Sequence, residues 1–237
     1  MKHLVSLRKE RPYREECGSA LLLSEKLVRE LPSSFSPKTL IVIDRGKIPA
    51  LPPAVETYVV TPDIFHKISG LASTDGVAAV VSLPRSSTLE NCTKILVVEG
   101  VADPGNLGTL LRTALALGWQ GVFLLPGCVD LYNDKVLRAS RAAPFHLPWR
   151  EGTLEDLEAL ITTSRLPLWI ADTEGTPLDT LSPKSGCILV LCSEARGPSD
   201  ALLKLGKRIT IPMQQHAESL NVAVAGSILM YYLGRDG

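Results

Sequence analysis

Polar side chains that could do chemistry gather in three loop-like segments of the sequence. Residues 99–114 read EGVADPGNLGTLLRTA and carry Asn106 and Arg112. Residues 191–200 read LCSEARGPSD and follow an apolar run, and residues 211–226 read IPMQQHAESLNVAVAG. In sheets of parallel strands, ligands bind where the loops gather at the carboxyl ends of the strands. We therefore expect these three segments to form a binding site.

The glycines of the first segment do not match a known phosphate-binding loop. Gly100 and Gly105 are not followed by Lys-Ser/Thr, which excludes a Walker A motif, and the spacing is not GxGxxG. Asp103 and Pro104 instead predict the start of a helix. Arg112 projects away from the apolar stripe of that helix, which consists of Leu107, Leu110, Leu111, Ala114 and Leu115. Taken alone, this signal is weak, because an ordinary surface arginine is the usual explanation for such a residue.

The composition narrows the class of protein. The five cysteines and four histidines are scattered without metal-ligand spacing, so we expect no metal and reduced thiols. No apolar run approaches the roughly 20 residues of a membrane span. The charged N-terminus lacks the apolar core of a secretory signal and is not acid-poor like a transit peptide. We expect an intracellular protein, cytoplasmic or organellar, that is not secreted.

Local charge suggests a polyanionic partner, although the formal net charge is zero. Basic residues cluster in residues 1–14 and in residues 135–150. Lys135, Arg138 and Arg141 would share a broad face of a helix and could contact RNA phosphates. The alternative is that they pair with acids such as Asp134 or Glu151 and only solvate the surface.

The apolar periodicity predicts an α/β protein with two domains. Before a polar linker near residues 83–93, strands are expected at 39–43 and 76–83 and helices at 19–31 and 61–70. After it, strands and helices alternate, which predicts a parallel sheet covered on both faces. Strands are expected at 94–100, 121–127, 167–171 and 187–192, and helices at 103–118, from Thr153, and at 219–233. The last helix is expected to turn Ala225, Ile228, Leu229 and Tyr232 inward.

In this order and spacing, DPGNLGTLLRTA, LCSEARG and IPMQQHAESLNVAVA resemble the three signature motifs of the SpoU (TrmH) class of SPOUT methyltransferases. The resemblance spans residues 94–233. It implies a methyltransferase domain at 91–237 with a deep trefoil knot, preceded at 1–90 by a small L30e-like RNA-binding domain. It also implies a homodimer that methylates a ribose 2′-hydroxyl in rRNA or tRNA with S-adenosylmethionine, and rRNA is the favoured substrate of the two.

The resemblance also implies roles for individual residues. The polar positions of the catalytic site are Asn106, Arg112, Glu194, Ser219 and Asn221. The cofactor-binding positions are Cys192, Gly197, Ile211, Met213 and Leu220. A guanidinium has a reference pKa above 12, so using Arg112 as a base near neutral pH would cost roughly 7 kcal/mol. A protonated Arg112 that stabilises the developing alkoxide avoids this cost.

Two positions depart from the pattern of the class. Cys192 and Gln215 stand where glycine is usual, and a glutamine fits poorly where glycine supplies a positive φ. These departures predict a cofactor loop of different shape. They also motivate an alternative function, that of a catalytically weak RNA-binding factor in ribosome assembly.

Overall fold

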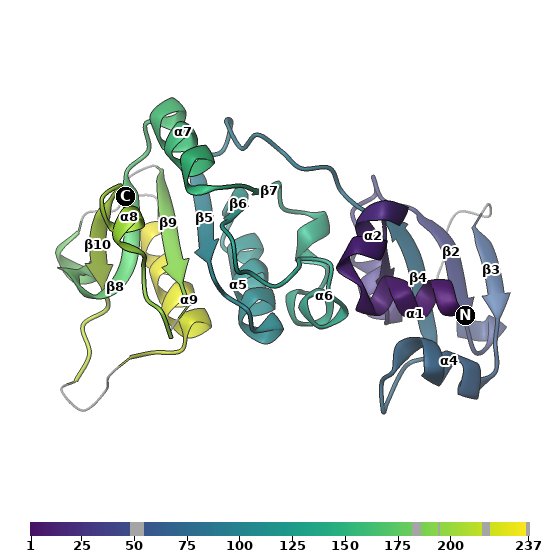
Figure 1. Ribbon diagram of the computed structural model, residues 1–237. Coiled ribbons are helices and arrows are strands. Elements are labelled where there is room, and N and C mark those ends of the chain that lie inside the picture. Colours follow the sequence, from purple (N-terminus) through teal and green to yellow (C-terminus); the bar gives the residue numbers. More distant parts are fainter. Residues whose placement is uncertain (48–54, 182–185, 194, 215–218, 236–237) are drawn as a thin grey trace. The chain divides into compact units, whose positions relative to one another are not determined.

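The chain forms two compact units (Figure 1). The computed structural model describes residues 1–47, 55–181, 186–193, 195–214 and 219–235. Unit 1 comprises residues 1–85 and 130–146, and unit 2 comprises residues 86–129 and 147–237. None of the helices in the described ranges has the length and apolarity needed to cross a membrane.

Unit 1 is built on a mixed sheet with strand order β1-β4-β2-β3. Its strands are β1 (Ser19–Leu22), β2 (Pro37–Val42), β3 (Glu56–Val59) and β4 (Val77–Ser82). Strand β4 runs antiparallel to β1 and β2, whereas β3 runs parallel to β2 at the sheet edge. The helical segments are α1 (Lys2–Lys9), α2 (Arg11–Cys17), α3 (Glu25–Arg29), η1 (Arg45–Lys47), α4 (Pro62–Ser69), α6 (Asp134–Ser140) and η2 (Ala143–Phe145).

The predicted helix at 19–31 is wrong in its first half. Ser19–Leu22 is strand β1, fully buried and paired with β4, and the helix α3 begins only after Ser24. The Ser24 hydroxyl caps α3 by accepting a hydrogen bond from the Lys26 N–H at 3.2 Å. A short apolar run is compatible with either state, so the long-range pairing with β4 decides it. The helix predicted at 61–70 is confirmed as α4.

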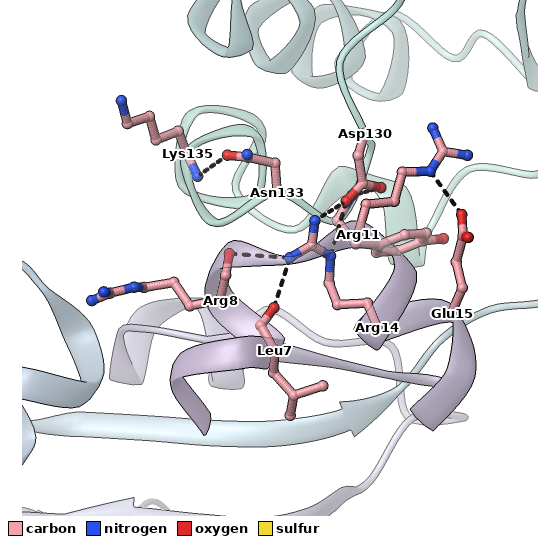
Figure 2. A network of polar contacts seen from close by, with 9 residues as sticks. Leu7, Arg8, Arg11, Arg14, Glu15, Asp130, Asn133 and Lys135 are labelled. Atoms are coloured by element: carbon pink, nitrogen blue, oxygen red, sulfur yellow. Dashed lines mark hydrogen bonds and ion pairs between the residues drawn. The ribbon is translucent and has the colours of Figure 1, made fainter. Parts of the chain in front are cut away.

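A buried arginine fixes the segment 130–146 within unit 1 (Figure 2). Arg14 on α2 is 2% exposed; its Nη1 donates to the Leu7 carbonyl at 2.7 Å and its Nε donates to the Asp130 carboxylate at 2.9 Å. The boundary predicted near residue 90 assigns residues 130–146 to the C-terminal domain, and the structure corrects this. The physical reason is that a buried guanidinium requires a carboxylate partner, and Asp130 supplies it from a distant part of the chain.

Unit 2 is a sheet of six parallel strands in the order β10-β8-β9-β5-β6-β7, as the alternating pattern predicted. The strands are β5 (Lys94–Glu99), β6 (Gly121–Leu124), β7 (Trp149–Glu151), β8 (Leu168–Pro177), β9 (Cys187–Cys192) and β10 (Lys207–Thr210). The helical segments are α5 (Pro104–Ala116), α7 (Leu154–Ser164), η3 (Leu178–Thr180), α8 (Asp200–Leu203) and α9 (Val222–Leu233). The trefoil knot implied by the family resemblance stays a prediction.

Helices cover both faces of this sheet. Leu157 and Leu160 of α7 and Leu202 of α8 belong to one core cluster with alternate residues of the strands. Helices α5 and α9 pack against each other on the opposite face, where a side chain at Gly226 would collide with Leu110 and Leu191. The lack of a side chain at Gly226 therefore lets α9 pack closely against α5 and the sheet.

The sequence signals at the helix ends are confirmed, but the prediction that Ile228 points inward is wrong. The Asp103 carboxylate accepts from the Asn106 N–H at 2.7 Å, and Thr153 and Asp156 form a capping box at α7. On α9, Leu229 is buried as predicted, whereas Ile228 is 39% exposed. Ile228 points outward because the inward positions of α9 are taken by residues at 223, 226 and 230.

We predict that Arg14→Ala lowers the stability of unit 1 by about 3–5 kcal/mol, because it leaves the Asp130 carboxylate without its partner. Urea denaturation followed by circular dichroism measures the loss. The control is Arg29→Ala, which removes the exposed pair with Glu25 and should cost about 0.5 kcal/mol or less. Equal costs for the two variants would contradict a central role for Arg14.

Candidate cofactor and catalytic site

A cavity of about 210 Å³ opens in unit 2 where β8, β9 and β10 end. The strands are parallel and adjacent in the sheet, so their carboxyl ends meet at one edge. Helix α9 closes the cavity along one side. The walls are formed by Ala171, Asp172, Thr173, Leu191, Cys192, Ser193, Gly197, Pro198, Ile209, Thr210, Ile211, Met213, Ser219, Leu220, Val222, Ala225 and Leu229.

All five predicted cofactor-binding positions line this cavity. They come from four places in the chain: the end of β9, the turn after it, the segment that follows β10, and the segment that precedes α9. The five are Cys192, Gly197, Ile211, Met213 and Leu220. The structure therefore brings together, in one pocket, residues that lie far apart along the sequence.

A bulge in β8 contributes wall residues that sequence reasoning missed. The pairing of β8 with β10 jumps from Ile170↔Arg208 to Thr176↔Ile209, so residues 171–175 have no counterparts in β10. This insertion carries Asp172 and Thr173 into the cavity wall. At Gly175 an added Cβ would lie 2.5 Å from the Ile209 backbone, so only glycine permits the return. The polar run Asp-Thr-Glu-Gly after an apolar strand was the available signal.

Glu99, the last residue of β5, anchors the turn that follows β9. Its carbonyl accepts from the Ser193 N–H at 3.0 Å, and its carboxylate accepts from the Ser199 hydroxyl at 3.3 Å. Ser199 in turn caps α8 by accepting from the Leu202 N–H at 3.3 Å. The turn that holds Gly197 is thus held to β5 at both ends.

Cys192 fits the end of β9 without strain. It is 8% exposed and is absent from the described residues with a positive φ, so a side chain is tolerated there. Burial raises the pKa of the Cys192 thiol, and the nearby Glu99 carboxylate raises it further. The thiol stays neutral near pH 7 and serves as an apolar part of the wall. The other glycine departure, Gln215, lies outside the described residues.

Two of the predicted catalytic residues are in direct contact. The Asn221 side-chain amide donates to the Asn106 side-chain carbonyl at 3.0 Å. The Asn221 Oδ1 also accepts from the N–H groups of Ala223 at 3.0 Å and Val224 at 3.3 Å, which caps α9. One side chain therefore ties the N-termini of α5 and α9 together beside Ser219, which lines the cavity.

Arg112 lies outside the described wall of the cavity. It is exposed on α5, as predicted, and it is not one of the described residues that form the cavity wall. Asn106 and Arg112 are six positions apart on α5, which places them about 120° from each other around the helix. Glu194, the fifth predicted catalytic residue, lies outside the described residues.

The predicted RNA-contacting residues belong to unit 1 rather than to the unit that holds the cavity. Arg138 pairs with Asp134, and Arg141 pairs with Glu30, where the Arg141 Nε donates to a carboxylate oxygen at 3.0 Å. Helix α6 ends at Ser140, so Arg141 does not continue the expected helical face. It takes a left-handed backbone conformation with φ of 55° instead. Lys135 is exposed.

Several known proteins share both the sequence pattern and the fold of this chain. The model of the SpoU rRNA Methylase family matches residues 93–231. The 23S rRNA (guanosine(2553)-2′-O)-methyltransferase RlmP of Bacillus subtilis is 33% identical over 224 residues, covering 93% of this chain and 90% of that protein. A solved TrmH-family protein from Porphyromonas gingivalis is 30% identical, with a TM-score of 0.86 over 98% of this chain and 95% of its own. An AdoMet-bound rRNA methyltransferase from Sinorhizobium meliloti shares the fold, with a TM-score of 0.85, 24% identity and coverage of 98% and 92%.

The chain belongs to the SpoU rRNA methylase family and is an RNA methyltransferase of that class. The methyl donor of the class is S-adenosylmethionine. The cavity fits this donor, since its aliphatic walls can hold an adenine ring, and the loops at 211–214 and 219–220 offer peptide groups outside helices and strands. The Asp172 carboxylate adds one negative charge for a cationic ligand.

We predict that Cys192→Ala binds S-adenosylmethionine within about threefold of the wild-type affinity, whereas Cys192→Phe weakens binding at least about tenfold, because a bulky ring fills the cavity. Isothermal titration calorimetry measures both. Cys187→Ala is the matched control, since it removes a buried thiol from the other end of β9, outside the described cavity wall. Wild-type affinity in a folded Cys192→Phe protein would show that the cavity is not the cofactor site.

Proposed function

We propose that this chain methylates a ribose 2′-hydroxyl of ribosomal RNA as a homodimer, with each active site assembled from two subunits. The observation that carries the proposal is that Arg112 is exposed on α5 and lies outside the described cavity wall, which the five cofactor positions and Ser219 line. The preference for rRNA over tRNA is supported by the family description and by the rRNA target of the Bacillus subtilis relative. A ribosomal target would place the protein inside the cell, and its five free cysteines are compatible with that setting.

An exposed apolar stripe supports the dimer. Val224, Ile228 and Tyr231 follow a spacing of i, i+4 and i+7 on α9 and are 49%, 39% and 60% exposed. Leu115, 37% exposed, lies on α5, which packs against α9 through Thr113 and a hydroxyl contact of 3.2 Å with Ser227. Large apolar side chains gathered on two adjacent helices are typical of a surface that another subunit covers. Arg112 lies one turn before Leu115 and would reach the partner's cavity from this surface.

The chain's own residues have distinct tasks in methyl transfer. The cofactor, when bound, supplies an electrophilic methyl group. Arg112, carried in by the second subunit, orients a phosphate and stabilises the negative charge that develops on the 2′-oxygen. Asn221 holds α5 and α9 in register through Asn106, so that the nucleophile meets the cavity mouth in a fixed geometry. Ser219 at the cavity edge can hydrogen-bond the ribose, and Glu194 can orient Arg112.

Subunit mixing tests the shared site. We predict that Arg112→Ala lowers kcat by about 10²–10³ while leaving cofactor affinity nearly intact. The Cys192→Phe variant should also be inactive, because the added ring blocks its cavity. If Arg112 serves the partner's cavity, one site of every mixed dimer is intact, and an equal mixture should recover about a quarter of wild-type activity. No recovery after proven subunit exchange would place Arg112 in the site of its own chain.

A salt titration tests the contribution of α6 to RNA affinity. Lys135, Arg138 and Arg141 are proposed to contact phosphates, with Lys135 the most available because the two arginines are ion-paired. Lys135→Ala should lower the slope of log affinity against log salt by about 0.7–0.9, because it removes one cation from the phosphate backbone. Arg138→Ala with Arg141→Ala should lower it further. Unchanged slopes with reduced thermal stability would mean that the arginines serve only to stabilise unit 1.

Two measurements decide the proposed reaction. Mass spectrometry of nucleosides from a strain that lacks the gene should show one 2′-O-methylated nucleotide missing from rRNA, with tRNA unchanged. Calorimetry with S-adenosylmethionine separates the enzyme from an assembly factor, which would bind RNA without the donor. Loss of a tRNA methyl group instead would overturn the rRNA assignment while preserving the enzyme class.

A further inference from the structure

A second cavity, of about 410 Å³, lies in unit 1, on the face of the sheet that α1 and α4 cover. It opens where the start of α1 and the side of α4 meet the edge strand β3. Its floor is aliphatic, and its rim carries an aromatic ring, a carboxylate and a hydroxyl. The lining residues are Met1, His3, Leu4, Thr39, Ile41, Glu56, Tyr58, Val60, Ile64, Ile68 and Val80.

The rim is set by the register of β3 against β2. Glu56 pairs with Thr39 and Tyr58 pairs with Ile41, and the two-residue period of a strand puts Glu56 and Tyr58 on the same face. The Tyr58 hydroxyl donates to the Glu56 carboxylate, which raises the pKa of Tyr58. This contact holds the ring and the carboxylate side by side at the mouth of the cavity.

The exposure of these residues sets this cavity apart from a packing defect. Tyr58 is 51% exposed and Ile64 is 39% exposed, although Ile68 at the floor is 2% exposed. A half-exposed aromatic ring beside an aliphatic hollow offers a stacking surface for a flat ligand. The Glu56 carboxylate selects against a phosphate at the same place and in favour of a ligand edge with N–H donors.

We propose that this cavity binds one unstacked nucleobase of the substrate RNA, with guanine preferred. The inference deepens the proposed function, because it assumes that the chain acts on RNA. A guanine presents two adjacent N–H groups on its Watson–Crick edge, which a carboxylate such as Glu56 can accept together, while uracil presents one. Tyr58 stacks on the base, and the aliphatic floor excludes water from it.

The basic residues around the cavity fit a nucleotide rather than an apolar peptide. Lys2 on α1 and Lys67 on α4 are exposed on the two helices that border the opening. They can meet the phosphates on either side of a bound base, which a peptide segment would not provide. A flat aromatic acceptor site flanked by cations is the arrangement used to bind single-stranded RNA.

Fluorescence anisotropy with two labelled oligonucleotides tests this site. The probes are a ten-nucleotide all-uridine RNA and the same RNA with one central guanosine. The wild-type protein should bind the guanosine probe at least about fivefold more tightly. Tyr58→Ala should weaken binding of that probe about tenfold, within the range expected when a base loses its aromatic stacking partner. Glu56→Gln should abolish the preference while keeping the affinity for the all-uridine probe.

Matched control variants separate the loss of the base contact from a general effect on the protein. Val59→Ala truncates an exposed neighbour on the opposite face of β3 and should change neither affinity nor preference. Tyr58→Phe keeps the ring and should retain most of the affinity. A folded Tyr58→Ala protein that binds both probes like the wild type would overturn the proposal, as would an unchanged guanosine preference in Glu56→Gln. Failure of the proposed function is seen separately, as lost methylation of full-length rRNA or lost cofactor binding with oligonucleotide binding intact.

Discussion

The parallel register of β8, β9 and β5 is the constraint on which the site depends. Because these strands are adjacent and run in the same direction, the chain segments that leave them arrive at one edge of the sheet. Glu99 of β5 then binds the turn after β9 through both its carbonyl and its carboxylate. The bulge in β8 extends the same edge with Asp172 and Thr173. The cavity results from the common direction of the strands together with the Glu99 contacts and the β8 bulge.

Helix α9 has three faces, and each lies in a different environment. Through these faces the helix links the cavity to the rest of unit 2. Residues 222, 225 and 229 line the cavity, and residues 223, 226 and 230 pack inward. Val224, Ile228 and Tyr231 remain exposed. Asn221 fixes the start of this helix against α5, so the exposed stripe and the cavity keep a constant relation. A second subunit seated on the stripe would therefore be positioned relative to the cofactor.

Unit 1 depends on a different kind of interaction. The guanidinium of Arg14 is almost fully buried and binds two backbone carbonyls as well as Asp130. Arg141 and Glu30 add a second link between the N-terminal part of unit 1 and the segment 130–146. These contacts hold α6 within unit 1, although the chain reaches α6 only after two strands and a helix of unit 2. Arg14 and Arg141, which belong to the two basic clusters of the sequence, therefore stabilise unit 1.

The sequence by itself determined the class of fold, the family and most of the site. Local signals carried this information: Asp103 and Thr153 cap their helices, and continuous apolar runs are typical of buried parallel strands. The three motifs resemble those of the SpoU class, and that resemblance implied the five cofactor positions that line the cavity. The helix caps and the apolar runs are short-range signals, because each depends on neighbours within a few positions along the chain.

The tertiary structure decided the features that depend on contacts between distant segments. Ser19–Leu22 became a strand because β4 pairs with it, and residues 130–146 joined unit 1 because Arg14 required a carboxylate. The outward position of Ile228 was set by what α9 packs against, and the β8 bulge by its register with β10. Local patterns alone do not settle these outcomes, since pairing, burial and the compensation of a buried charge are decided between residues far apart in sequence.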